Sequence, residues 1–340
     1  MRRLLVTIFT LAFALGAVGA FVFTREHVQQ AAVVPAVQAP DRDKADAKDS
    51  TEQWPDDAGS PEQVMYAQPQ LMQDAVQRLL PRTPEKANLY LVGFAGDGDE
   101  NVFRNEVEFV ERQFVQRFDA AGHTLLLINN PATVAQRPLA SLTNLGTAID
   151  AAAGRMDPDQ DILLLFLTSH GSREHELYVG LDPLPLDQIT PQDLSDLFAD
   201  SPIRYRVIVI SACYSGGFID ALKNDTTMII TAARADRASF GCGTESEITD
   251  FGRAFFVEGL NNSDSFPAAF ATASSLIDAW ETRDDEEHSL PQFATTPQIE
   301  ARLKAWRSGI RLGPPVPFKA AAPPPHPDDG SLTAATFRLH

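Results

Sequence analysis

The chain has 340 residues and a formal net charge of −18, because 46 acidic residues outnumber 28 lysines and arginines. This balance disfavours a nucleic-acid partner, since phosphate binding needs clustered Lys and Arg and no such cluster is visible. A hydrophobic content of 44% is typical of globular proteins, and the length suffices for one large domain or two small ones.

The amino terminus carries an apolar stretch. Arg2 and Arg3 precede an uncharged run from residue 4 to 23, which is long enough to cross a bilayer. Residues 1–23 are therefore predicted to be a signal anchor with its arginines in the cytoplasm. The Val-Gly-Ala at 18–20 also resembles a cleavage site, so a removed signal peptide is the alternative. Either way we expect an extracytoplasmic protein, anchored in the cytoplasmic membrane and facing the periplasm, or else secreted.

Two segments lack a sustained apolar pattern and are predicted to be disordered. Residues 24–60 are mainly Ala, Pro, Gln, Asp and Lys and form a linker. Residues 313–340 are rich in proline and form an extended tail. Between them lies one predicted domain, residues 61–312.

Within this domain, apolar runs alternate with amphipathic stretches. The apolar runs have almost no polar alternation, which indicates strands buried on both faces of a parallel sheet. Strands are predicted at 89–94, 124–128, 162–169, 205–212 and 227–233, with a short hairpin at 176–181. Helices are predicted at 62–80, 102–121, 142–156, 191–198, 251–260, 267–287 and 297–306, and a short one ends at 222. This order predicts a right-handed parallel α/β sheet.

Two of the predicted strands end at reactive side chains. The strand at 162–169 leads into His170 and Gly171, and the strand at 205–212 leads into Cys213. Ligands of parallel sheets lie at the carboxyl ends of the strands. The placement therefore predicts a cysteine nucleophile that is activated by histidine.

The surrounding residues suit acyl transfer through a thioester. A thiol with a pKa of about 8.5 needs a neighbouring imidazole or helix amino terminus to form the thiolate, and Cys213 is followed by two glycines that let the chain turn into a helix. The N–H groups of Gly171 and Cys213 are predicted to form an oxyanion hole. We expect neither a cofactor nor a metal.

The chain has two cysteines, Cys213 and Cys242. A disulfide between them is one interpretation in an oxidising compartment. A thiol at the end of a buried strand and beside glycines looks placed for access, and a domain of this size does not need a bridge. We therefore predict a free Cys213.

The residues Thr168-Ser169-His170-Gly171 and the run Ile-Ser-Ala-Cys-Tyr-Ser-Gly at 210–216 resemble the active-site strands of legumain-like cysteine peptidases. The resemblance covers about 89–260. It implies a three-layer caspase-like α/β fold, with a mainly parallel sheet and helices on both faces. It also implies a cysteine endopeptidase that acts on a protein or peptide substrate, with His170 as the general base and Cys213 as the nucleophile.

The resemblance also suggests a substrate pocket. Arg104 and Asp250 fall where the family builds its first specificity pocket, and Asn101 or Asn105 falls near the family's Asn at the start of the first helix. The alternative interpretations are a solvated helix residue for Arg104 and a helix cap before Phe251 for Asp250.

The sequence departs from the family at two positions. Ser169 precedes the histidine where legumains typically have Asp, and Ser211 lies where an acidic pocket residue is expected. The cleavage chemistry is therefore a safer expectation than a preference for asparagine. A carboxylate cluster at Asp97, Asp99 and Glu100 can be read as a Ca²⁺ site, but Gly96 and Gly98 favour a solvated loop.

Three other functions compete with the peptidase. An α/β-hydrolase would use His288 as base, but Ser211 and Ser215 occupy the positions where its cysteine elbow needs glycine. A membrane-anchored scaffold would keep the fold and bind partners through its tail. A transpeptidase would use the same Cys-His pair and pass the thioester to an amine. The pattern leaves the oligomeric state open.

Overall fold

A computed structural model of the chain describes residue 54, residues 58–243 and residues 246–320. The predicted signal anchor at 1–23 and nearly all of the predicted linker lie outside the described residues and stay predictions. Among the helices that are described, none has the length and apolar character needed to cross a bilayer.

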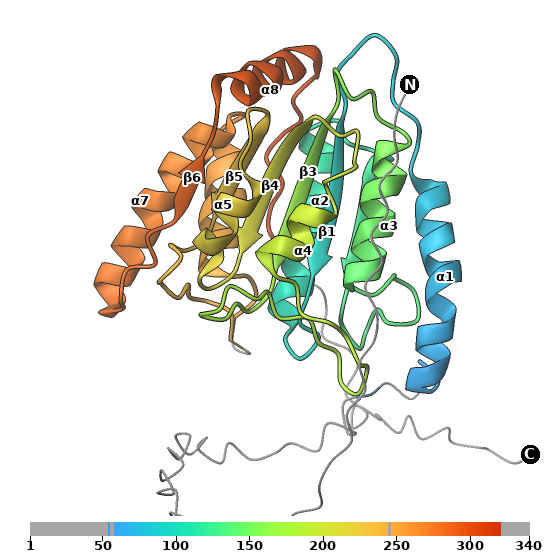
Figure 1. Cartoon of the computed structure of the whole chain (residues 1–340). Coiled ribbons are helices and arrows are strands. Elements are labelled where there is room, and N and C mark those ends of the chain that lie inside the picture. The colour runs from blue at the N-terminus through green and yellow to red at the C-terminus, as the bar shows by residue number, and fades with distance from the viewer. Residues whose placement is uncertain (1–53, 55–57, 244–245, 321–340) are drawn as a thin grey trace, which may run out of the picture. The chain divides into compact units, whose positions relative to one another are not determined.

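Six strands form one sheet in the order β2-β1-β3-β4-β5-β6 (Figure 1). The first five strands are parallel to one another, and β6 pairs antiparallel with β5. The strands are β1 (Leu89–Ala95), β2 (Thr124–Ile128), β3 (Ile162–Thr168), β4 (Tyr205–Ser211), β5 (Thr227–Thr231) and β6 (Gln292–Ala294). The predicted mainly parallel α/β fold is confirmed.

Helices cover both faces of the sheet. One face packs against α1 (Pro61–Arg78), α3 (Leu142–Ala153), α4 (Pro191–Asp196) and α5 (Ile219–Leu222). The other packs against α2 (Asn101–Arg117), α6 (Asp250–Gly252), the π-helix η3 (Arg253–Leu260), α7 (Phe266–Asp284) and α8 (Pro297–Gly309). These three layers match the predicted caspase-like architecture.

The buried strands explain the uninterrupted apolar runs. All seven residues of β3 are buried, because alternate side chains enter the two cores on either side of the sheet. Leu164 and Phe166 belong to the core beneath α2, whereas Leu163 and Leu165 belong to the core beneath α3. No residue of such a strand needs to be polar.

Helix starts follow local capping signals. The side chain of Ser60 accepts a hydrogen bond from the N–H of Gln63 while the Gln63 side chain accepts one from the N–H of Ser60, and Pro61 is the first residue of α1. Thr190 caps α4 through the same reciprocal pair, with Asp193, and Thr296 caps α8 by accepting from the N–H of Ile299; each lies directly before a proline. These signals explain why the predicted amino-terminal bounds lie close to the observed ones.

Two elements of the sheet region differ from the prediction. The hairpin expected at 176–181 is present only as isolated bridges, in which Leu177 pairs with Gly171 and Ile189 and Gly180 with Asp97. The edge strand β6 was not predicted, because its three residues are too few to show a periodic pattern.

The domain extends beyond its predicted carboxyl-terminal boundary at residue 312. The predicted tail begins at Gly313, but residues 313–320 pack on the domain. Val316 is buried, and its carbonyl and N–H both bond to the side chain of Asn261. Arg117 donates to the carbonyl of Gly313 at 2.7 Å. Only residues 321–340 of the predicted tail lie outside the described part of the chain.

Candidate active site

The strand register brings His170 and Cys213 to the same edge of the sheet. In the pairing of β3 with β4, Thr168 lies opposite Ser211. His170 and Cys213 each follow two residues later along the chain. The N–H of Ser169 donates to the carbonyl of Ser211 at 3.2 Å, so the two chains remain paired beyond the strands. The imidazole and the thiol therefore come from neighbouring positions on the carboxyl edge.

Hydrogen bonds surround the half-buried sulfur of Cys213. The thiol of Cys242 is one partner, and the N–H of Ser239 donates to Sγ at 3.2 Å. The hydrogen bond with Cys242 is the largest cause that lowers the pKa of the Cys213 thiol, to about 5, although burial opposes the shift. The positive charge of His170 lowers this pKa further. The site thus favours a thiolate at neutral pH.

The two sulfur atoms are not covalently joined, since both cysteines are free. The hydrogen bond to Cys213 raises the pKa of Cys242, so Cys242 keeps its proton while Cys213 ionises. This agrees with the predicted free thiol. No sequence pattern indicated that the second cysteine would lie beside the first.

The chain after Cys213 makes a tight turn. Tyr214 adopts the left-handed conformation with φ 56°, and it is followed by the 3-10 helix η2 (Ser215–Phe218) and the four-residue helix α5. The helix predicted to follow Cys213 is therefore too short for its amino terminus to supply an appreciable dipole. The hydrogen bonds from Cys242 and Ser239, rather than a helix end, account for the lowered pKa of Cys213.

The two glycines after Cys213 allow a close approach of other segments. A Cβ on Gly217 would lie 2.2 Å from the ring of His175, and one on Gly216 would lie 2.6 Å from the backbone nitrogen of Ala235. His175 bonds through Nε2 to the carbonyl of Ala235 at 3.0 Å. The loop that follows His170 is thereby packed onto the turn that follows Cys213.

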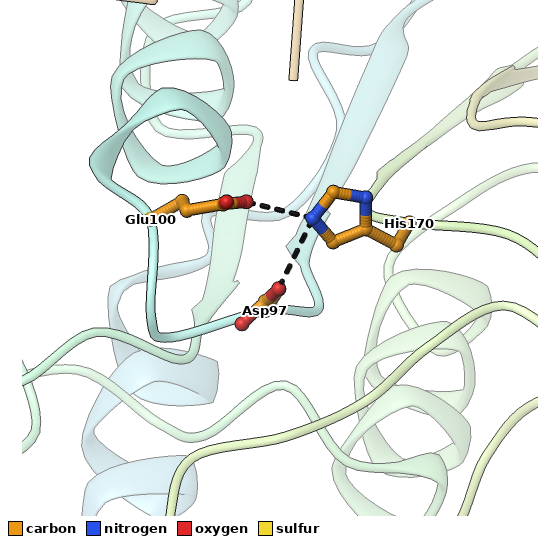
Figure 2. Close-up of side chains that lie close together, drawn as sticks. All are labelled: Asp97, Glu100 and His170. Atoms are coloured by element: carbon orange, nitrogen blue, oxygen red, sulfur yellow. Dashed lines mark hydrogen bonds and ion pairs between the residues drawn. The ribbon is translucent and has the colours of Figure 1, made fainter. Parts of the chain in front are cut away.

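Two carboxylates contact the imidazole of His170 (Figure 2). Nε2 lies 2.7 Å from Oε2 of Glu100 and 3.5 Å from Oδ2 of Asp97, and the ring of Phe103 meets the imidazole edge-on. Within the described part of the chain, no hydrogen bond joins His170 to Cys213. The polar contacts of the imidazole with described residues are all made at Nε2.

The solvated loop predicted at 97–100 is only partly correct, because Asp99 is exposed and Glu100 is half-buried, but Asp97 is buried. Asp97 is only 4% exposed, and burial raises the pKa of its carboxyl to about 6. Backbone hydrogen bonds tie this loop to the segment after His170: the N–H of Gly98 donates to the carbonyl of Gly180, and the N–H of Gly180 donates to the carbonyl of Gly96, each at 2.9 Å. Gly96 and Gly98 allow the segment at 178–181 to pack closely against this loop.

The imidazole of His170 and its two carboxylate neighbours form the group of described residues that can hold a metal ion. The ligand atoms of Asp97, Glu100 and His170 all lie within 4.8 Å of one another. One imidazole nitrogen with carboxylate oxygens suits zinc or another transition ion. The sequence predicted no metal, and the calcium interpretation that it raised used Asp99 in place of His170.

Backbone donors are available beside the thiol. Gly171 faces Leu177 in an isolated bridge, whose hydrogen bonds are made by the residues on either side of that pair. The N–H groups of Gly171 and Cys213 donate to no other described residue. Both remain available to the oxygen of a substrate carbonyl, as an oxyanion hole requires.

The predicted pocket residues fall into two places. Oγ of Ser211 lies 3.0 Å from Oγ1 of Thr249, and Asp250 comes next in the chain. Thr249, not Asp250, caps α6, so Asp250 is not the helix cap. Arg104 is buried instead of solvated and donates to Oδ1 of Asn130, at the end of β2.

A buried carboxylate beneath this edge was not predicted. Glu106 of α2 is fully buried and accepts hydrogen bonds from Thr168 at 2.6 Å and Thr249 at 2.9 Å. Burial raises the pKa of Glu106 to about 7. A signal was present, because Glu106 falls three residues after Phe103 on the apolar face of the predicted helix.

The two asparagines considered for the family's Asn position have other partners. Asn101 accepts from the side chain of Asn130 at 3.1 Å, and Asn105 donates to the carbonyl of Glu247 at 3.0 Å. The side chain at the start of this helix that hydrogen-bonds to the imidazole is the carboxylate of Glu100. The sequence pattern missed it because it lies in a run of acidic residues that is typical of solvated loops.

The base required by the hydrolase alternative is engaged elsewhere. Nδ1 of His288 lies 2.9 Å from Asp278 and 3.6 Å from Glu281, both on α7. This pairing gives His288 a structural role against the helix that precedes it in the chain.

Comparison with known proteins gives one family. Residues 147–298 match the model of the Peptidase C13 family. The match includes β3, β4, His170 and Cys213, and it begins after α2. No curated protein matches the chain. Over residues 147–298 the chain is similar to the Peptidase C13 family, the legumain family of cysteine peptidases, as the two strand-end motifs predicted.

Proposed function

We propose that the protein is a cysteine endopeptidase in which Cys213 is the nucleophile and His170 is the general base. The match of residues 147–298 to the Peptidase C13 family supports the class of enzyme. The observation that carries the proposed pair is the register of β3 and β4, which sets the two residues at neighbouring positions of one edge. The pKa of Cys213, lowered to about 5, supports its role as the group that attacks.

The proposed reaction has two halves. The thiolate of Cys213 attacks the carbonyl carbon of a peptide bond, and the N–H groups of Gly171 and Cys213 hold the negative oxygen that forms. Protonated His170 gives its proton to the leaving nitrogen, so the C–N bond breaks and a thioester remains. Water then attacks the thioester while His170 takes its proton, which releases the acid and restores the thiolate.

The proposal does not include a preference for asparagine. Ser211 is buried and bonded to Thr249, so it supplies no carboxylate to a pocket. Ser169 donates from Oγ to the carbonyl of Tyr178 at 2.7 Å and thereby holds the loop after His170. Both departures from the family pattern concern recognition and support, and the attacking thiol is untouched by them.

The test uses the purified full chain with a library of peptides, and cleavage is followed by mass spectrometry. We expect cleavage by the unaltered protein and none by Cys213→Ala or His170→Ala. His288→Ala is the matched histidine control and should cleave normally. An added amine separates hydrolysis from transpeptidation, because it would appear in the product of the latter.

A thiol-reactive peptide probe supplies the second measurement. Labelling at Cys213 should exceed labelling at Cys242 and should fall strongly in His170→Ala. Equal labelling of the two cysteines without any cleavage would favour the non-catalytic scaffold, and loss of activity only in His288→Ala would favour the hydrolase.

A further inference from the structure

Glu100 stands at the N-cap position of α2 without capping the helix. Its backbone has the extended conformation expected there, with φ −126° and ψ 132°, but its side chain makes no hydrogen bond to the helix N–H groups. Ser, Thr, Asp and Asn at this position usually accept one. The carboxylate instead reaches Nε2 of His170 at 2.7 Å, so the helix start gives up a capping bond in favour of the imidazole.

The two carboxylates beside Nε2 have different surroundings. Asp97 is the more distant, at 3.5 Å, and its other oxygen accepts a hydrogen bond from the N–H of Asp99 at 2.9 Å. Asp97 therefore holds the turn of its own loop. Glu100 is closer, at 2.7 Å, and its side chain is 16% exposed against 5% for Asp97. Of the two, Glu100 has the geometry of a direct hydrogen-bond acceptor.

The first turn of α2 contacts the imidazole in two ways. Glu100 bonds to Nε2, and Phe103 places its ring edge-on to the imidazole with the ring centres 5.2 Å apart. The loop before the helix is tied by backbone hydrogen bonds to the segment that follows His170. The helix start and the imidazole are thus fixed relative to each other.

We propose that Glu100 is the positioning residue for His170. By accepting the hydrogen bond from Nε2–H it keeps the proton on that nitrogen, so that Nδ1 is the nitrogen that takes the thiol proton of Cys213. Figure 2 shows both carboxylates on the Nε2 side of the ring. Once His170 is protonated, the negative Glu100 stabilises the imidazolium, and no proton passes to the carboxylate.

This inference rests on the proposed function, since it assigns a partner to the proposed base. The test compares Glu100→Gln and Glu100→Ala with the unaltered full chain on a peptide found by the library screen. Gln keeps an acceptor oxygen but loses the charge, whereas Ala loses both. We expect kcat to fall in the order Glu, Gln, Ala, with a loss of about a hundredfold for Ala and KM changed less than about twofold.

Glu111→Ala is the matched control for these variants. Glu111 lies on the same helix and also accepts a hydrogen bond, from Thr124 at 2.8 Å, but it is one of the residues toward the other end of α2. Its loss should leave kcat unchanged. The rate of alkylation of Cys213 by iodoacetamide gives a second readout that needs no substrate, and it should fall in Glu100→Ala while thermal unfolding stays cooperative.

Four outcomes decide the matter. Graded loss of kcat in the two Glu100 variants supports the proposal. Unaltered activity in Glu100→Ala, in a chain where Cys213→Ala is inactive, overturns the inference and leaves the peptidase intact. A larger loss in Asp97→Asn than in Glu100→Gln would assign the role to Asp97. Loss of activity in EDTA with recovery in zinc would make Glu100 a metal ligand and overturn the proposal as well.

Discussion

A Cβ atom on Gly171 would lie 2.1 Å from the carbonyl oxygen of Cys213 and 3.0 Å from its carbonyl carbon. Real Cβ atoms do not approach backbone this closely, so the residue after the proposed base has to be glycine because of the backbone of the proposed nucleophile. The two segments of the site are therefore packed in direct contact through the main chain.

Gly171→Ala tests this contact. The added methyl group must push the backbone of Cys213 aside, so we expect cleavage to be lost and the free energy of unfolding to fall by about 1–3 kcal/mol. A cleavage assay and urea unfolding measure the two effects. Gly309→Ala is the matched control, because a Cβ there meets no atom within 4 Å. Full activity in Gly171→Ala would contradict the contact.

Glu106 should make the stability of the fold depend on pH. Burial raises the pKa of this carboxyl from 4.5 to about 7, so the folded chain holds the proton more tightly than the unfolded chain does. This contribution to stability is complete below pH 4.5 and is lost as the pH rises through 7. Its size is about 3 kcal/mol, because a tenfold change in proton affinity corresponds to about 1.36 kcal/mol.

Glu106→Gln removes that dependence, because an amide stays neutral at every pH. Urea unfolding of both proteins at pH 5 and pH 8 gives the comparison. The stability of the variant relative to the unaltered chain should rise by about 2–3 kcal/mol between these pH values, because the smaller part of the effect is already lost at pH 5. A constant difference would mean that Glu106 does not titrate in this range.

Cys242 should govern the reactivity of Cys213. Its thiol donates a hydrogen bond that is the largest cause of the lowered pKa of Cys213, so Cys242→Ala should raise that pKa from about 5. Alkylation of Cys213 with iodoacetamide over a range of pH, resolved by peptide mass spectrometry, gives the midpoint. Cys242→Ser keeps an O–H donor and should hold the midpoint lower than Ala does. Identical midpoints in all three proteins would remove Cys242 from the site.

The five parallel strands were predictable because they are buried on both faces. The run at 162–168 is almost entirely apolar, so its periodicity does not distinguish a strand from a buried helix. Its short length indicates the strand. β6 was not predictable, since three half-buried residues carry no period. The end of α2 at Arg117 falls four residues before the predicted one, because helix ends depend on caps more than on periodicity.

The site was predictable only where it follows strand ends. His170 and Cys213 each follow an apolar run that marks a buried strand in the sequence, and the carboxyl ends of parallel strands lie at one edge of the sheet. Glu100 and Cys242 reach them across loops that are distant in the chain, and such contacts leave no local pattern. The burial of Asp97 was not predicted for the same reason. An acidic loop is expected to be solvated unless the segment that covers it is known.

The packing of residues 313–320 sets where a shortened protein can safely end. A recombinant fragment cut at 312 would leave Arg117 with the carbonyl of Leu260 but without that of Gly313, and it would remove both backbone groups of Val316 that bond to Asn261. It would also uncover Phe109, against which the ring of Phe318 lies edge-on. Expression designs that stop at residue 320 keep all three contacts, so the segment that closes the core beside α2 stays in place.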